Sequence, residues 1–239
     1  MKAIMKAIII GASSGIGREL AKILAREGYK IGVVARRKEL LVSLQNEIHS
    51  SIFIRQADIS HPEEAMAHVE ALIQDMHGVD LVILSSGVGF PNPEFDWNKD
   101  KETIEVNVIG FCAMANVFMK HFLSQGHGHL VGISSIAALR GSSGTYSASK
   151  AFVSNYLESL RHQMAKEQRD ITITDIQPGF VDTAMAKGAT FWVAPVEQAA
   201  EMIVQAIQKK KTHAYITSRW KFIAWLLKWM PNFVYDRFF

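Results

Sequence analysis

A tyrosine and a lysine four residues apart have the types and spacing that acid–base chemistry requires. The segment Tyr146-Ser-Ala-Ser-Lys150 opens a stretch with helical periodicity, and residues four apart lie on one face of a helix. A phenol has an unperturbed pKa of about 10, and a nearby cation favours the phenolate. We therefore expect Lys150 to lower the pKa of Tyr146, so that the tyrosine exchanges a proton with a substrate oxygen near neutral pH.

Two serines precede this pair. Residues His129–Ile133 have the composition of a buried strand, and Ser134 and Ser135 follow it directly. In an open parallel sheet, ligands bind beyond the carboxyl ends of the strands. A serine hydroxyl there would face the same site as Tyr146 and hydrogen-bond a substrate carbonyl, although serines at strand ends are also common turn formers.

A glycine-rich turn stands near the start of the chain. The segment Gly11-Ala-Ser-Ser-Gly15-Ile-Gly17 lies between the apolar run Ala7–Ile10 and a helical stretch. Glycines let the backbone approach a pyrophosphate closely while the N–H groups at the helix start face the anion. Such spacing also occurs in ordinary turns, but the strand–turn–helix context favours a phosphate site. We assign to it Gly11, Ser13, Ser14, Gly15, Ile16 and Gly17, with Arg18 in support.

The end of the second predicted strand distinguishes between nicotinamide cofactors. A carboxylate at this place would accept hydrogen bonds from ribose hydroxyls, whereas a cation would pair with a 2′-phosphate. Here Arg36 and Arg37 follow Ala35, which favours NADP(H) over NAD(H); a solvated helix start is the alternative. Asp58, with Ile59, is placed to meet the adenine edge, or else Asp58 caps the helix that begins near Pro62.

The elements that position these residues alternate between strand and helix. Short β-branched runs separated by helical stretches are typical of a parallel sheet covered on both faces. We predict a single α/β domain over residues 1–218, Rossmann-type and doubly wound, followed by a tail at 219–239. The predicted strands are Ala7–Ile10, Lys30–Ala35, Ile52–Gln56, Leu81–Leu84, His129–Ile133, Ile171–Ile176 and Ala214–Thr217, and the helices Gly17–Glu27, Lys38–His49, Pro62–Met76, Lys101–Leu123, Tyr146–Glu167 and Pro195–Gln208.

Taken in order, these motifs resemble the compact, single-domain branch of the short-chain dehydrogenase/reductase family over nearly the whole chain. The matching positions are Gly11, Gly15, Gly17, Asp58, Gly87, Asn107, Ser135, Tyr146, Lys150 and the run from Pro178 to Thr183.

The resemblance implies a mechanism in which Tyr146 gives a proton to a carbonyl oxygen, or takes it from an alcohol, while the nicotinamide carries the hydride. Ser135 would polarise that oxygen and Lys150 would also bind the nicotinamide ribose. It further implies that Asn107 holds a water linking Lys150 to solvent, and that the carboxamide is held near Val181 and Thr183. The cofactor positions carried over also include Ser86, Gly87, Pro178 and Gly179.

Two features depart from the family pattern. Leu84-Ser85-Ser86-Gly87 stands where the family usually has Asn-Asn-Ala-Gly, which affects stability more than chemistry. Ser135 and Tyr146 are eleven positions apart, about two fewer than in the family pattern, so the connection is short. Motif alignment selects Ser135, but Ser134 stays open as the catalytic serine.

Composition excludes several other functions. The net charge of +3 comes from scattered lysines and arginines, which argues against a nucleic-acid partner. The single cysteine, Cys112, and the lack of an export signal predict a cytoplasmic protein. His121, His127 and His129 have no second cluster at ligand-like spacing, so we assign no metal.

The tail RWKFIAWLLKWMPNFVYDRFF, residues 219–239, is apolar and basic. Lys221 and Lys228 share one predicted helix face with Ala224, and the other residues form a broad apolar surface. Pro231 and the cations make it too short to span a bilayer. It is expected to cover the substrate pocket, to join subunits of a homo-dimer or homo-tetramer, or to lie on the cytoplasmic face of a membrane.

These observations predict an NADP(H)-dependent oxidoreductase acting on a carbonyl or alcohol. A lipophilic substrate is suggested by Trp97, Phe191 and Trp192, which we expect near the pocket mouth, where residues 180–192 would form a lid. The rival from another class is a non-catalytic NADP(H)-binding redox sensor or scaffold acting through the tail. A nucleotide-sugar epimerase is disfavoured by the length of the chain.

Overall fold

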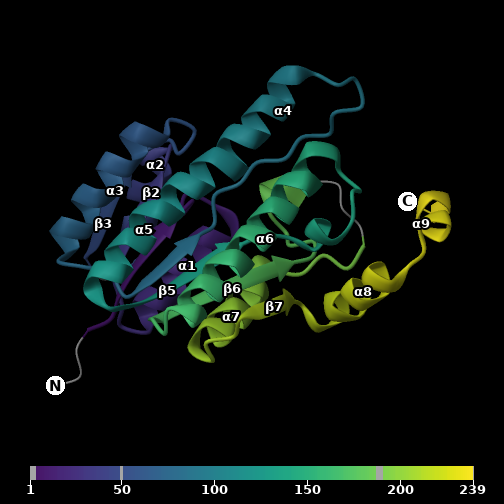
Figure 1. Ribbon diagram of the computed structural model, residues 1–239. Helices are drawn as coiled ribbons and strands as arrows, with labels where there is room; N and C mark the ends of the chain where they lie inside the picture. Colours follow the sequence, from purple (N-terminus) through teal and green to yellow (C-terminus); the bar gives the residue numbers. More distant parts are fainter. Residues whose placement is uncertain (1–3, 49–50, 187–190, 239) are drawn as a thin grey trace.

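A sheet of parallel strands forms the centre of the protein (Figure 1). The structure is a computed structural model that describes residues 4–48, 51–186 and 191–238. Within these ranges seven strands run in the order β3-β2-β1-β4-β5-β6-β7, and every pairing is parallel. The predicted Rossmann-type, doubly wound α/β fold is therefore confirmed. The strands are β1 (Lys6–Ile10), β2 (Lys30–Ala35), β3 (Ile52–Gln56), β4 (Leu81–Leu84), β5 (His127–Ile133), β6 (Asp170–Pro178) and β7 (His213–Ile216).

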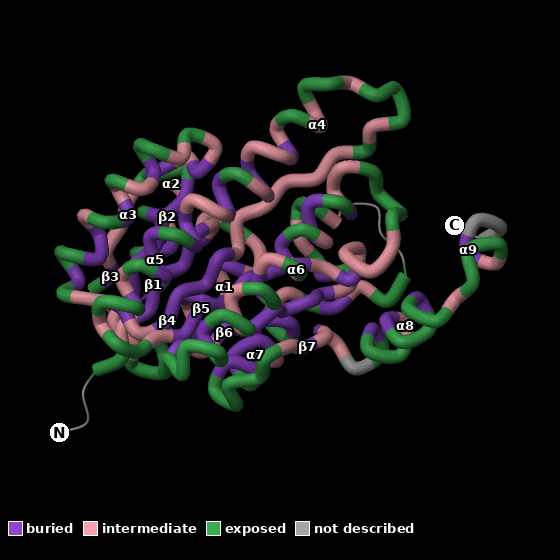
Figure 2. The backbone as a smooth tube through the Cα atoms, viewed as in Figure 1, coloured by how far each residue is buried: buried purple, intermediate pink, exposed green. Residues whose placement is uncertain are grey.

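Helices cover both faces of this sheet because successive strand residues point to opposite sides. In β1, Ile9 packs with helices α1 (Gly15–Arg26), α2 (Lys38–Glu47) and α7 (Val196–Gln208). Its neighbours Ile8 and Ile10 pack on the other face with α3 (Pro62–Met76), α5 (Phe111–Gln125) and α6 (Gly144–Lys166). Figure 2 shows the buried strands between these two helical layers.

The strand order places a crevice beside β1. The chain builds β2 and β3 on one side of β1, then returns so that β4 pairs with β1 on the other side. Where the direction of winding changes, the loops beyond the strand ends separate and leave room for a ligand. The turn after Ile10 lies there, and the N–H of Ser85 donates to the Ile10 carbonyl over 2.8 Å.

A long helical stretch crosses one side of the sheet. It consists of α4 (Trp97–Ile104), a π-helical turn (Glu105–Gly110) and α5. Among the described residues, this stretch alone is long and apolar enough to cross a membrane, but 56% of the relevant window is buried inside the protein. That burial is typical of a core helix, and π-helical turns often occur at functional sites.

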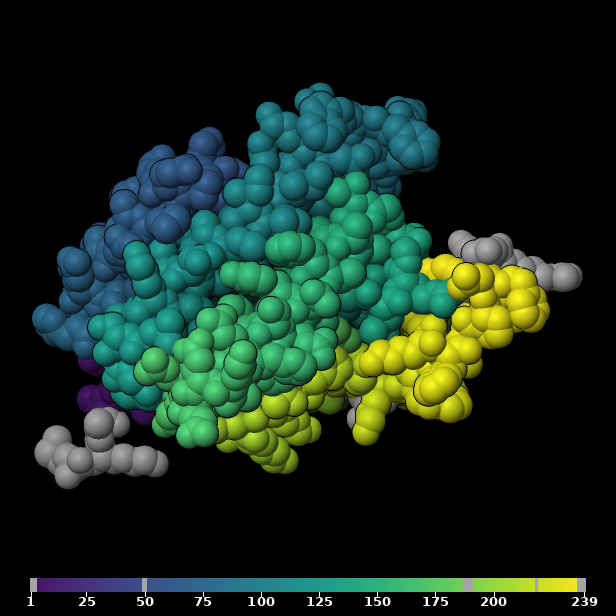
Figure 3. Space-filling model, in the orientation of Figure 1, coloured from purple at the N-terminus to yellow at the C-terminus, as the bar shows by residue number. Residues whose placement is uncertain are grey.

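The tail forms two further helices at one end of the molecule, shown in yellow in Figures 1 and 3. They are α8 (Ser218–Trp229) and α9 (Asn232–Phe238). Trp220, Leu227 and Tyr235 pack with Ile136 in a small apolar cluster. Ala224, predicted on a cationic face, is fully buried in the same cluster, because its small side chain lets α8 approach the 3₁₀ turn at Ile136–Leu139 closely.

Candidate active site

One continuous cavity of about 1670 Å³ lies beyond the carboxyl ends of the strands. It brings together most of the residues that the sequence assigned to a site. Gly17 and Asn107 are not among its lining residues. The predicted residues that line it are Gly11, Ser13, Ser14, Gly15, Ile16, Arg36, Arg37, Asp58, Ile59, Ser86, Gly87, Ser135, Tyr146, Lys150, Pro178, Gly179, Val181 and Thr183.

Tyr146 lies in the first turn of α6, close to Ser135 at the end of β5. Burial raises the pKa of Tyr146, and a hydrogen bond with the Ser135 side chain opposes that rise. The net shift is upward, so the predicted net lowering of the Tyr146 pKa is wrong for this arrangement, in which burial outweighs any stabilisation of the phenolate by Lys150. Burial dominates because the ring lies against the loop after β4, where a Cβ on Gly89 would come within 2.6 Å of it.

Lys150 is buried one helical turn further on. Its ammonium Nζ donates to the Ile133 carbonyl over 3.0 Å and lies 5.8 Å from the centre of the Tyr146 ring. Burial lowers the pKa of Lys150 to about 8, while the charge of Asp175 opposes this shift. Tyr146 and Lys150 thus share one face of α6, as predicted. The pKa of Lys150 lies closer to neutral pH than that of an exposed lysine.

Asn107 connects the π-helical turn to the loop after β4. Its Oδ1 accepts from the Val88 N–H over 2.9 Å, and its Nδ2 donates to the Val88 carbonyl over 2.8 Å. The same Nδ2 donates to Ser149 Oγ over 2.9 Å. These bonds fix the loop that carries Gly87 and Gly89 against α6, so Asn107 acts as a positioning residue in this structure.

The two candidate serines have different surroundings. Ser134 is buried, and its Oγ hydrogen-bonds Asp175 Oδ1 and lies 3.1 Å from the Ile176 carbonyl. Both serines are among the residues that line the cavity, but Ser135 is the more exposed of the two, and its Oγ accepts from the Ala137 N–H over 3.1 Å. The geometry therefore favours Ser135 as the residue that faces a substrate.

The glycine-rich turn is shaped for close approach of a ligand. Gly11 has a φ of +93°, and a Cβ there would lie 2.6 Å from the Ser86 nitrogen. A Cβ on Gly17 would lie 2.3 Å from the Gly11 carbonyl oxygen. Side chains are excluded at both positions, which leaves the backbone at the start of α1 open to an anion.

Arg37 is positioned beside that turn. Its guanidinium donates to Ser13 Oγ over 3.0 Å and to Ser14 Oγ over 2.8 Å. Arg36 lies 3.7 Å from Asp58 and 3.8 Å from Glu102. Asp58 accepts from the Ser60 N–H over 3.0 Å and lines the cavity, but His61 is the N-cap of α3, so the interpretation of Asp58 as the cap of that helix is wrong and its contact with the adenine edge stays a prediction.

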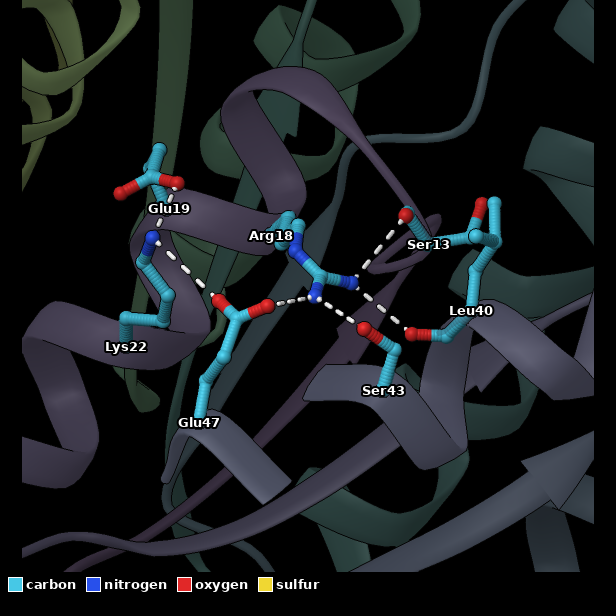
Figure 4. A network of polar contacts seen from close by, with 7 residues as sticks. All are labelled: Ser13, Arg18, Glu19, Lys22, Leu40, Ser43 and Glu47. Atoms are coloured by element: carbon cyan, nitrogen blue, oxygen red, sulfur yellow. Dashed lines mark hydrogen bonds and ion pairs between the residues drawn. The ribbon is translucent and has the colours of Figure 1, made fainter. Parts of the chain in front are cut away.

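Arg18 lies between the turn and α2: its guanidinium is 3.5 Å from the Ser13 carbonyl oxygen, but its other partners belong to α2, and its support of a phosphate stays a prediction. Figure 4 shows its guanidinium among residues of α2. It donates to the Leu40 carbonyl over 2.8 Å and to Ser43 Oγ over 3.1 Å, and it forms an ion pair with Glu47. These contacts hold Arg18 at the interface between α1 and α2. The hydrogen bond and charge of Arg18 also lower the pKa of Glu47.

Aromatic side chains enclose the other half of the cavity. The Trp220 ring lies edge-on to Phe180 at 5.5 Å and to Phe191 at 5.9 Å, and its Nε1 donates to the Trp192 carbonyl over 3.2 Å. Phe191 stands near the pocket as expected. Trp97, predicted near the mouth, is 66% exposed and is not among the lining residues, where Phe95 is found instead. Part of the predicted lid, residues 187–190, lies outside the described residues.

Several site residues were missed in the sequence. Arg140 and Tyr235 line the cavity, and Asp175 lies behind Lys150. No motif identifies Arg140 or Tyr235, because their proximity depends on how the tail folds back. Asp175 was detectable only as an acid inside a largely β-branched strand, which is unusual for a buried position.

The histidines that invited a metal reading are engaged in ordinary contacts. His129 Nε2 lies 2.8 Å from Thr174 Oγ1, and His121 Nε2 lies 3.0 Å from Gln125 Oε1. In the part of the chain that the structure describes, no group of three His, Cys, Asp or Glu residues has metal-binding geometry.

Comparisons with known proteins agree with this arrangement. An uncharacterised oxidoreductase of Myxococcus xanthus (strain DK1622) is 30% identical over 240 residues, covering 96% of this chain and 94% of the relative. A short-chain dehydrogenase/reductase of Burkholderia phymatum, solved with NAD, superposes with a TM-score of 0.86 at 22% identity, covering 93% of this chain and 92% of the other. A short-chain dehydrogenase of Burkholderia cenocepacia, solved with NADP, gives 0.84 at 23% identity, covering 98% and 97%.

The decisive comparison is with the family itself. The model of the short chain dehydrogenase family matches residues 5–194, which include the glycine-rich turn, Ser135, Tyr146 and Lys150. The chain therefore belongs to the short-chain dehydrogenase family of oxidoreductases.

Proposed function

We propose that this protein transfers a hydride between NADP(H) and the carbonyl or alcohol carbon of a lipophilic substrate, with Tyr146 as the general acid and base. One observation carries the proposal. Ser135 and Tyr146 line the same cavity as the glycine-rich turn and the aromatic wall around Trp220.

The residues around the turn fit a nicotinamide dinucleotide, which would supply the hydride carrier. Gly11 and Gly17 leave room for a pyrophosphate at the start of α1. Arg37, held by Ser13 and Ser14, and Arg36 offer guanidinium groups where a 2′-phosphate would bind. No carboxylate replaces them at the end of β2, and this supports NADP(H) over NAD(H).

The proton chemistry follows from the surroundings of Tyr146. In carbonyl reduction the phenol gives its proton to the substrate oxygen, and in alcohol oxidation it takes one. Ser135 donates a hydrogen bond to the same oxygen and so stabilises its developing charge. Lys150, when protonated, stabilises the phenolate by its charge, and Asn107 fixes the loop that closes over both.

The aromatic half of the cavity supports a lipophilic substrate. Phe180, Phe191 and Trp220 present rings to it, together with Ile223 and Leu227 from α8. Apolar side chains with few polar groups are typical of sites for apolar ligands. A cytoplasmic location and a homo-dimer or homo-tetramer stay predictions from the sequence.

Tyr146→Phe tests the proposal. We expect wild-type and variant proteins to bind NADPH with equal affinity and more tightly than NADH, as followed by nicotinamide fluorescence. Only the wild type should reduce members of a panel of aliphatic and aromatic ketones, because the variant lacks the proton donor. Tight binding with no turnover of any carbonyl by the wild type would instead favour the redox-sensor or scaffold alternative.

A further inference from the structure

The outward face of helix α8 is apolar. On an ordinary surface helix the face turned away from the protein is polar. Here Phe222, Trp225 and Trp229 are 61%, 59% and 76% exposed, and Leu226 adjoins them. The opposite face carries Trp220, Ala224 and Leu227, which are buried against the protein. The tail thus has two apolar faces, and only one of them is covered within this chain's described residues.

Cations border the exposed apolar face. At 100° per residue, Lys221 and Lys228 lie along one edge of the face and Arg219 along the other, and all three are exposed. The described part of α8 contains no acidic residue. Aromatic rings flanked by lysine and arginine suit the boundary between lipid headgroups and acyl chains, where the cations reach the phosphates.

A second exposed aromatic group lies at the same end of the molecule. Phe95 and Trp97, in and after the loop that follows β4, are 87% and 66% exposed. Figure 1 shows this loop and helices α8 and α9 at one end of the protein. Phe233 of α9 adds a further exposed ring. The cavity opens between these segments, since Phe95 and Tyr235 both line it.

We propose that the exposed face of α8, together with Phe233, binds the surface of an anionic phospholipid bilayer and lies in its interface without crossing it. The charge of the surface distinguishes this occupant from a second copy of the chain. Because α8 has no acidic residue, a contact between two copies of this face would give its cations no partner from the other α8, whereas each cation near an anionic membrane adds to binding. Docked in this way, α8 lies between the lipid surface and the cavity, which Trp220 and Leu227 on its buried face line.

Vesicle flotation of the full-length protein tests the proposal without any substrate, so its result does not depend on the proposed activity. One set of vesicles contains phosphatidylcholine alone, and the other also contains phosphatidylglycerol. We expect the wild type to float with the anionic vesicles and to bind the neutral ones at least about tenfold more weakly.

Two double variants locate the surface. Trp225→Ser with Trp229→Ser should abolish flotation with both vesicle types, because it removes the rings that insert. Lys221→Glu with Lys228→Glu should lower binding to anionic vesicles about tenfold and leave the weak binding to neutral ones unchanged. A matched charge reversal on other helices, Lys120→Glu with Lys166→Glu, should float as the wild type does; both lysines are exposed.

Three results would overturn the proposal. The first is a wild type that fails to float with either vesicle type. The second is an equal loss of binding in the Lys120 and Lys166 control, which would indicate general charge attraction. The third is a loss of oligomers in the Trp225 and Trp229 variant, measured by light scattering without vesicles, which would assign the face to a second copy. Unchanged nicotinamide binding by each variant verifies folding.

Discussion

The guanidinium carbon of Arg140 lies 4.4 Å from the centre of the Tyr235 ring. The same guanidinium donates to the Met230 carbonyl over 3.2 Å and to Asn232 Oδ1 over 2.9 Å. Arg140 follows the 3₁₀ turn after Ser135, while its three partners belong to the end of the tail. One side chain therefore holds the junction of α8 and α9 over the cavity.

Arg140→Ala should release this junction and enlarge the substrate half of the site. We expect KM for a lipophilic ketone to rise about tenfold, equivalent to about 1.4 kcal/mol, with NADPH affinity unchanged. Steady-state kinetics and cofactor titration measure the two effects. Arg169→Ala, which removes an exposed arginine far from the tail, is the control. Equal weakening of substrate and cofactor would contradict a role confined to the tail.

Asp175→Asn should change how Lys150 titrates. The carboxylate raises the pKa of Lys150 against the effect of burial, so its removal should bring that pKa below about 8. At a pH above the pKa of Lys150, each unit by which that pKa falls reduces the protonated fraction of the lysine up to tenfold. The pH at which NADPH affinity weakens on the alkaline side should therefore move downward. Ser154→Ala removes a partner of Asp175 without removing the charge, and an identical pH profile in both variants would refute the charge effect.

Arg37→Glu should alter the choice of cofactor. Loss of a charge-assisted hydrogen bond and the addition of an anion should weaken NADPH binding by about 10- to 100-fold. NADH affinity should change little, because NADH has no 2′-phosphate to repel. Fluorescence titration with both cofactors gives the ratio, and Arg169→Glu controls for net charge. A parallel loss for NADH would indicate that Arg37 supports the turn rather than the phosphate.

Acid should destabilise the protein partly through His129. Burial, with the Lys210 charge adding to it, lowers the pKa of His129 to about 4. Between pH 6.5 and 4 the unfolded chain therefore binds more protons than the folded one, so stability falls as the pH drops through this window. The resulting loss in the free energy of unfolding is on the order of 3 kcal/mol. His129→Gln should flatten the acid limb of denaturant-midpoint measurements against pH, whereas His162→Gln, at an exposed position, should leave it steep.

Much of the fold was predictable because the periodicity of buried strands and amphipathic helices is local. The strands β2, β3 and β4 begin and end where their apolar runs predict. The association of Tyr146 with Ser135 was also predictable, since both follow from motif order and the carboxyl-end rule for parallel sheets.

Features set by packing were not predictable. The pKa of Tyr146 moves upward because the fold buries the ring, and spacing to Lys150 contains no information on burial. Arg18 lies on a helix whose rotation directs it to α2. Ala224 is buried because the tail folds back on Ile136, a long-range contact that a helical wheel cannot show.

The outer wall of the cavity comes from a different length of chain than its chemical groups. Tyr146 and the glycine-rich turn belong to the segment matched by the family model, whereas Trp220, Ile223 and Leu227 come after it. Under the proposed function, part of the substrate wall is thus encoded after the segment that carries the chemical groups, although Phe180 and Phe191 lie within that segment. Exchanging the last two helices with those of another oxidoreductase should therefore alter which compounds fit the cavity while leaving Tyr146 and the glycine-rich turn in place, which makes the tail a natural unit for recombination and for engineering.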